Sequence, residues 1–370
     1  MNKLITYLHK VPVWITSFCI LMSFNACKKD NNNRDNVVAP PSPLGTLGLY
    51  QFGNGLNKRI FVQITRVGTQ TVNYASIFDT GSSGMTMDAD GLIPASMITS
   101  SGIQVTGDSV EVNGITVTSR TGILSYGDLT GLTREYGNLA YATVTIGNSA
   151  QGSLTTKRIP FFMYYKIVDS KGNQLAKHAA DVFGVGPGSG YGNIPVSSPL
   201  AAFNYPANVT NGFKLAALNS TSFDAKGTYV AGLLTVGLVN TDLTSSGFIM
   251  HPLTYTATNG YSPNIPATIT YNNTSVAAKV LFDTGTPSVS TIENTRETKA
   301  LGQLPDNSTV TITTERGFTY TYTTNSNGNL TEIQNPNISG DFRSIMSIDF
   351  FVNNLFLTDY TNHQIGLKNK

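Results

Sequence analysis

Cysteine is nearly absent from this sequence. Only Cys19 and Cys27, both near the N-terminus, occur among its 370 residues. Cys19 falls in an apolar segment that we expect to be removed, so the remaining chain cannot form an internal disulfide. Its stability must therefore come from a packed core.

Charged residues are also scarce. They make up 12% of the sequence, about half of the ~25% that is typical of soluble domains. The 24 lysines and arginines nearly balance the 22 aspartates and glutamates, which leaves no basic field for a nucleic-acid partner. Glycine, threonine, serine and asparagine are abundant instead, as is typical of β-rich proteins outside the cytoplasm.

Signatures of metal and nucleotide sites are missing as well. The four histidines are scattered without the spacing of metal ligands, and we expect them in loops or at the surface. They are His9, His178, His251 and His363. No Gly-x-Ser-x-Gly or P-loop sequence occurs, and the glycine-rich residues 184–192 do not fit the dinucleotide-binding pattern. We expect neither a metal ion nor a cofactor.

The N-terminal segment has the features of an export signal. Two lysines precede an apolar run over residues 11–24, which is too short to span a membrane comfortably. The run leads into "SFNAC", which resembles a bacterial lipobox with Phe24 in place of the usual leucine. The resemblance implies a lipoprotein signal peptide over residues 1–26 and a lipid on Cys27, with simple secretion as the alternative.

The next residues, "KKDNNNRDNVVAPPSP", are polar and end in prolines. They predict a flexible tether over residues 27–45. A lipid on Cys27 would anchor the protein to a membrane of the bacterial cell envelope, at its periplasmic face or at the cell surface.

The rest of the chain predicts an all-β fold. Short runs rich in β-branched and aromatic residues alternate with turn residues, as in "RIFVQITRV", "YATVTIGN", "PATITYN" and "FTYTYTT". Only residues 197–205 and 292–301 have a helical pattern, and both segments are short.

One short sequence occurs twice. The apolar part of "ASIFDTGSSGMTM" ends at Asp79, and that of "KVLFDTGTPSVS" ends at Asp283. A single Asp-Thr-Gly is common in turns, because Asp caps backbone N–H groups and Gly accepts a positive φ. Two copies, each after apolar strand residues, are harder to explain in this way. Two carboxyl groups brought together can share one proton and activate water.

Each copy is followed by an apolar segment of related type. These segments are residues 179–186, "AADVFGVG", and residues 342–351, "FRSIMSIDFF". The repeat predicts two similar β lobes that face each other and bring Asp79 and Asp283 together.

These features resemble the pepsin-like (family A1) aspartic proteases. "LSYGDLTG", with Tyr126 and Gly127, is similar to the flap hairpin of the family, and "AGLLTVGLVN" to the strand that joins its lobes. The resemblance extends through the C-terminal run and covers about residues 46–370. It implies a bilobal fold of two pseudo-twofold-related β lobes, residues 46–230 and 231–370, with the active-site cleft between them.

The resemblance also implies roles for individual residues. Asp79 and Asp283 would be the catalytic pair that holds the attacking water, and Tyr126 and Gly127 would belong to the substrate-binding flap. The residues that support the pair would be Thr80, Gly81, Ser82, Thr284, Gly285 and Thr286. The implied activity is hydrolysis of an extended peptide or protein substrate by a monomer, without a covalent intermediate.

The chain departs from the family pattern in several places. Thr86 stands where a tryptophan usually bonds the flap tyrosine, so Tyr126 would lose this indole partner. Pro287 replaces a small hydroxyl residue, Ser347 replaces a glycine in the second apolar segment, and the flap tip at residues 128–129 is unusual.

Other hypotheses remain open. A degenerate member of the family, with weak or no catalysis, would still bind extended peptides, because the cleft and the catalytic pair are separable. An unrelated β-sandwich adhesin or glycan binder would leave the repeated triplet unexplained. Two carboxylates also serve glycoside hydrolysis, but that chemistry does not require Asp-Thr-Gly loops.

Overall fold

The computed structural model of the chain describes residues 40–128, 131–148, 150–190, 194–298 and 302–370. The predicted signal peptide, Cys27 and the tether as far as residue 39 lie outside the described residues, as does residue 129 of the flap tip. Within the described ranges, no helix is long and apolar enough to cross a membrane.

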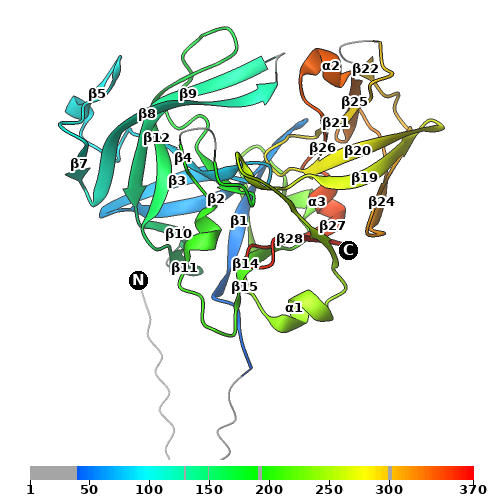
Figure 1. Cartoon of the computed structure of the whole chain (residues 1–370), viewed down its shortest axis with the longest axis horizontal. Coiled ribbons are helices and arrows are strands. Elements are labelled where there is room, and N and C mark those ends of the chain that lie inside the picture. The colour runs from blue at the N-terminus through cyan, green and yellow to red at the C-terminus, as the bar shows by residue number, and fades with distance from the viewer. Residues whose placement is uncertain (1–39, 129–130, 149, 191–193, 299–301) are drawn as a thin grey trace, which may run out of the picture. The chain divides into compact units, whose positions relative to one another are not determined.

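Strands dominate these residues, which confirms the predicted all-β fold (Figure 1). Most of them belong to one mixed sheet. In the order of pairing, its strands are β16 (Ile249–Pro252), β28 (Gln364–Asn369), β27 (Asn354–Asp359), β14 (Thr210–Leu215), β15 (Thr228–Leu238), β1 (Gly45–Asn54), β2 (Asn57–Val67), β3 (Gln70–Asp79), β13 (Val182–Val185), β4 (Ser83–Asp88), β12 (Ile159–Val168), β9 (Gly131–Ala142), β8 (Ile115–Asp128) and β7 (Ser109–Val112), with β10 (Val144–Asn148) paired to β2 and β11 (Gly152–Thr155) paired to β10.

A second mixed sheet comes entirely from the C-terminal half. Its strands, in order of pairing, are β22 (Gly302–Gln303), β25 (Leu330–Gln334), β21 (Val289–Glu293), β26 (Arg343–Met346), β20 (Thr274–Phe282), β19 (Ile265–Tyr271), β23 (Thr309–Thr314) and β24 (Thr319–Thr323). The remaining elements are short: β5 (Ile98–Thr99) with β6 (Gly102–Ile103), β17 (Thr254–Thr256) with β18 (Gly260–Ser262), α1 (Asn240–Thr244), α2 (Pro336–Ser339), α3 (Phe350–Asn353), and 3-10 turns at Ala95–Met97, Pro199–Ala202 and Ser220–Ser222.

The repeated sequence has a repeated strand arrangement. β3 ends at the first Asp-Thr-Gly and pairs in parallel with β13, whose Phe183 lies opposite Phe78. β20 leads to the second Asp-Thr-Gly and pairs in parallel with β26, whose Met346 lies opposite Phe282. Both phenylalanines before the aspartates are buried, and each packs against another aromatic ring, Phe78 against Phe213 and Phe282 against Phe350.

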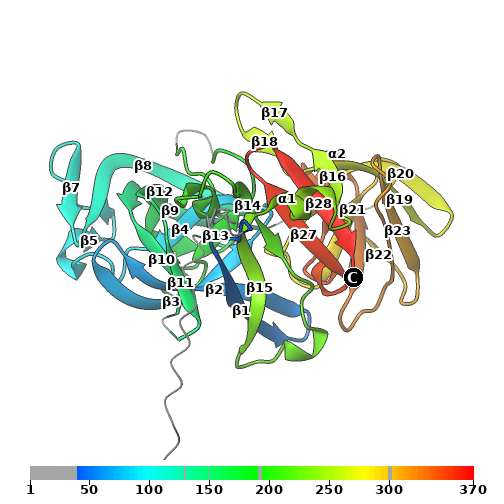
Figure 2. The ribbon, with the colours of Figure 1, turned by 90° about the horizontal axis from the view of Figure 1, so that it is seen from below.

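The two halves are joined through the larger sheet. β27 and β28, at the end of the chain, pair with each other, and β27 pairs with β14 of the first half. Figure 2 shows β14, β27 and β28 side by side. The predicted lobe boundary at residue 230 falls inside β15, which continues without a break to Leu238.

Three local predictions differ from the structure. Residues 292 and 293 end β21 rather than begin a helix, because β21 pairs in parallel with β25. Of residues 197–205, only Pro199–Ala202 forms a single 3-10 turn. His251 is not at the surface: it is buried in β16, with Nε2 at 2.8 Å from Thr314 Oγ1.

Candidate active site

Asp79 and Asp283 lie side by side, although they come from opposite halves of the chain. Each carboxyl group lies against a glycine of the other loop. A Cβ on Gly81 would come within 2.5 Å of Asp283 Cγ, and a Cβ on Gly285 within 2.6 Å of Asp79 Cγ. Both loops therefore require glycine, because a side chain at either position would displace the facing carboxyl group.

Nearly matching hydrogen bonds orient the two carboxyl groups. Asp79 Oδ1 accepts from the backbone N–H of Gly81 at 2.7 Å and of Ser82 at 3.1 Å. Asp79 Oδ2 accepts from Ser82 Oγ at 2.6 Å. The corresponding donors to Asp283 are Gly285 N and Thr286 Oγ1, both at 2.7 Å. Each aspartate is thus held by its own loop, with one oxygen bonded to backbone N–H and the other to a hydroxyl.

The two loops are also bonded to each other. The N–H of Thr80 donates to Thr284 Oγ1 and the N–H of Thr284 donates to Thr80 Oγ1, both at 3.0 Å. The hydroxyls donate onward to the carbonyls of Phe282 at 2.8 Å and Phe78 at 2.6 Å. Both threonines are buried, so these crossed bonds fix the relative position of the aspartates without help from solvent.

The surroundings of Asp79 favour its protonated form. Burial, the charge of Asp283 and a hydrogen bond between the two carboxyl groups together raise the pKa of Asp79 well above its ordinary value. The bonds from Ser82 and Gly81 act in the opposite direction but are weaker. A shared proton makes one member of the pair an acid and the other a base at the same pH.

Tyr126 belongs to the hairpin of β8 and β9, in which it pairs with Thr133. Its hydroxyl donates to Thr86 Oγ1 at 3.3 Å and to Glu135 Oε2 at 3.5 Å. Two other partners thus take the place of the absent indole. Gly127 follows in the same strand with a φ of +103°, which glycine accepts without strain.

Glu135 is a member of this site that the sequence did not indicate. It lies on β9, its side chain is fully buried, and its Oε1 accepts from Thr86 Oγ1 at 3.3 Å. Burial and the charge of Asp181 raise the pKa of Glu135 well above its ordinary value, and the hydrogen bonds from Thr86 and Tyr126 offset this only in part. A buried acid of the same hairpin therefore links the Tyr126 hydroxyl to Thr86 of β4.

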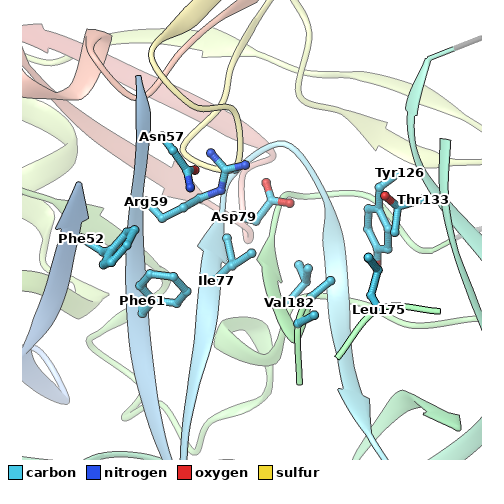
Figure 3. A pocket seen from close by; sticks show the side chains of 13 residues that line it. Phe52, Asn57, Arg59, Phe61, Ile77, Asp79, Tyr126, Thr133, Leu175 and Val182 are labelled. Carbon is cyan, nitrogen blue, oxygen red and sulfur yellow. The ribbon is translucent and has the colours of Figure 1, made fainter. Parts of the chain in front are cut away.

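A cavity of about 420 Å³ opens beside Asp79. In Figure 3, Arg59 and Tyr126 lie on opposite sides of Asp79, with Ile77 and Val182 below it. The cavity is enclosed mainly by apolar side chains, so a bound chain would lose water around the carboxyl groups.

The arrangement of this chain matches that of a solved structure. An aspartic proteinase from Irpex lacteus superposes on it with a TM-score of 0.54 and 17% sequence identity, covering 88% of this chain and 97% of that one. The fold is pepsin-like. No protein-family model and no curated protein matches the sequence.

The departures from the family sequence fit the pepsin-like fold. Ser347 is buried, and Ser290 Oγ donates to its hydroxyl at 3.2 Å and accepts from its backbone N–H at 3.1 Å. The carbonyl of Pro287 accepts from the N–H of Val289 at 2.6 Å. Neither residue disturbs the hydrogen bonds of the Asp283 loop.

Asp181 stands in the sequence between Ala180 and Val182, which both line the cavity. Asp181 is buried and accepts from Tyr164 Oη at 2.7 Å, and its Oδ2 lies 2.7 Å from His178 Nδ1. Burial lowers the pKa of His178, but the hydrogen bond and charge of Asp181 outweigh it, so the net shift is upward. Across the described residues, no group of three or more His, Cys, Asp and Glu side chains is placed to hold a metal ion.

Proposed function

We propose that this protein is an aspartic endopeptidase. The observation that carries the proposal is the aspartate pair, in which each carboxyl group lies against the glycine of the other loop and the two loops are joined by crossed threonine hydroxyls. A protein that only binds peptides has no need for two buried carboxyl groups in contact, because such a pair costs free energy.

The proposed reaction uses the shared proton of Asp79 and Asp283. The ionised member takes a proton from a water molecule, whose oxygen attacks the scissile carbonyl carbon. The protonated member donates to the carbonyl oxygen as negative charge develops there. Transfer of a proton to the amide nitrogen then breaks the C–N bond and releases an amine and a carboxylic acid.

The flap hairpin would close over an extended substrate. Tyr126 lines the cavity opposite Arg59, and the peptide would lie between the hairpin and Asp79. Backbone hydrogen bonds to an extended chain and exclusion of bulk water are the expected contributions of such a hairpin.

We also propose that Cys27 carries a lipid that anchors a monomeric protein to a bacterial envelope membrane. The support is the sequence before Cys27 and the polar residues after it. Metabolic labelling with a fatty acid should mark the wild type and not Cys27→Ala. Equal labelling of both would refute the anchor.

The test of the enzyme uses a diverse peptide mixture from pH 3 to pH 8, with mass spectrometry of new termini. The wild type and Asp108→Asn, a matched change at an exposed aspartate, should cleave the mixture, and Asp79→Asn should not. Intact peptides at every pH, together with retention of peptides on the immobilised folded protein, would favour the alternative, a pepsin-like peptide-binding lipoprotein without activity.

A further inference from the structure

One wall of the cavity carries a positive charge. Arg59 and Phe61 lie on the same face of β2, because alternate residues of a strand point to the same side. Phe52 of β1 pairs with Arg59, and Phe61 pairs with Ile77 of β3. All four residues line the cavity, so this face of three adjacent strands forms its wall (Figure 3).

The guanidinium of Arg59 uses little of its hydrogen-bonding capacity. Its Nη1 donates to the carbonyl of Lys58 at 3.0 Å, and among the described residues it forms no ion pair within 4.0 Å. The neighbouring Lys58, by contrast, pairs with Asp349 at 2.7 Å. A guanidinium has five N–H donors in a planar fork that fits a carboxylate. Most of this fork is therefore available to a ligand.

The surroundings of Arg59 favour pairing with a ligand. Burial lowers the pKa of its guanidinium, and the charges of Asp283 and Asp79 raise it only in part, so the cation has lost water without gaining a bonded carboxylate. The carboxyl groups of the pair already receive donors from their own loops. A carboxylate brought by a substrate would complete the coordination of Arg59.

We propose that Arg59 is a specificity-determining residue, which pairs with a glutamate or aspartate side chain of the substrate bound beside the aspartate pair. This inference rests on the proposed peptidase function. The apolar wall formed by Phe61 and Ile77 would contact the methylene groups of the substrate side chain, and the Arg59 fork would bind its carboxylate. The substrates are then peptides with an acidic residue close to the cleaved bond.

The test uses the full-length protein and a series of acetylated octapeptides. Each peptide has apolar residues and a single Glu or Gln, whose position differs from one peptide to the next. The variants are Arg59→Gln and the matched control Arg66→Gln, which removes the same charge from an exposed position on the same strand. At one position, the wild type and the control should show kcat/KM about tenfold higher for Glu than for Gln, as expected of a hydrogen bond to a charged group. In Arg59→Gln this ratio should fall to about one, whereas in Arg66→Gln it should stay at about ten.

Two results would overturn the inference. One is a Glu-to-Gln ratio near one at every position in the wild type. The other is an equal loss for both peptides in Arg59→Gln with a displaced pH profile, which would mean that Arg59 acts on the aspartate pair instead. If no peptide is cleaved, the peptidase proposal fails separately. Fluorescence anisotropy of labelled peptides then decides: a Glu preference in binding that Arg59→Gln abolishes supports the pairing, and its absence refutes it.

Discussion

The crossed threonine hydroxyls allow a direct test of how the aspartate loops are held together. In Thr284→Val, the side chain keeps its volume but loses the buried hydroxyl that bonds the backbone of Thr80 and of Phe78. The N–H of Thr80 would lose its acceptor at 3.0 Å, and the carbonyl of Phe78 would lose its donor at 2.6 Å. A buried polar group without a partner costs about 1–3 kcal/mol, so two such groups should lower the free energy of unfolding by about 2–6 kcal/mol.

Thr284→Ser is the matched control, because it keeps the hydroxyl and removes one buried methyl group. A lost methyl group costs about 0.5–1.5 kcal/mol. Both variants would be unfolded in urea, and unfolding would be followed by circular dichroism and by the fluorescence of the 17 tyrosines. If the dependence of the free energy of unfolding on urea is the same in all proteins, the shift of each urea midpoint gives the loss of stability of that variant.

The stability of the two variants separates hydrogen bonding from packing. A loss below about 1 kcal/mol in Thr284→Val would refute the assignment of two obligatory hydrogen bonds to this hydroxyl. A loss in Thr284→Ser as large as in Thr284→Val would also refute it, since packing of the methyl group would then explain both.

Three further predictions concern pH and close packing. Burial raises the pKa of Glu135 above 4.5, so above this pH the unfolded chain loses the Glu135 proton more readily than the folded protein does. The wild type should therefore lose stability relative to Glu135→Gln as the pH rises past 4.5. Melting temperatures of the two proteins that stay parallel from pH 4 to pH 8 would contradict this. The raised pKa of His178 means that its bond to Asp181 stabilises the fold below pH 6.5 and ceases to do so as pH rises through the raised value. His178→Asn should therefore cost more stability at pH 5.5 than at pH 9 in urea unfolding, and an equal cost at both would count against the pair. Gly81→Ala should lower kcat/KM for peptide hydrolysis about a hundredfold by displacing the facing carboxyl group, whereas Gly45→Ala, whose Cβ would have its nearest contact at 3.5 Å, should not; equal activities would exclude the steric argument.

The fold and the centre of the site could be predicted because their signals are local. An apolar strand that runs into Asp-Thr-Gly specifies a buried aspartate, and its repetition specifies two of them. The β-branched runs likewise predicted strands such as β19, in which every second side chain is buried. The helix predicted for residues 292–301 failed at its start, because pairing of β21 with β25 as far as Glu293 overrides the weak local preference.

The residues around the pair could not be predicted, because long-range strand pairing places them. Arg59 belongs to "NKRIFVQITRV", and a charged side chain in such an alternating strand is typical of the face that points to solvent. That face becomes a cavity wall only because β2 pairs with β1 and β3. Glu135 is buried where it meets Thr86 of β4 and Tyr126 of β8, and no spacing within the sequence of β9 indicates these contacts.

The two halves support the aspartates almost equally, but the surroundings are unequal. Tyr126, Glu135 and Arg59 all come from the first half of the chain. The pair alone would accept a peptide in either direction, since either carboxyl group can serve as the base. If the protein cleaves peptides, the hairpin that carries Tyr126 and the cavity wall that carries Arg59 would remove this equivalence and set the direction of the bound peptide. Changes at Arg59 should therefore alter which peptides are cut, whereas changes at Asp79 or Gly81 should decide whether any peptide is cut.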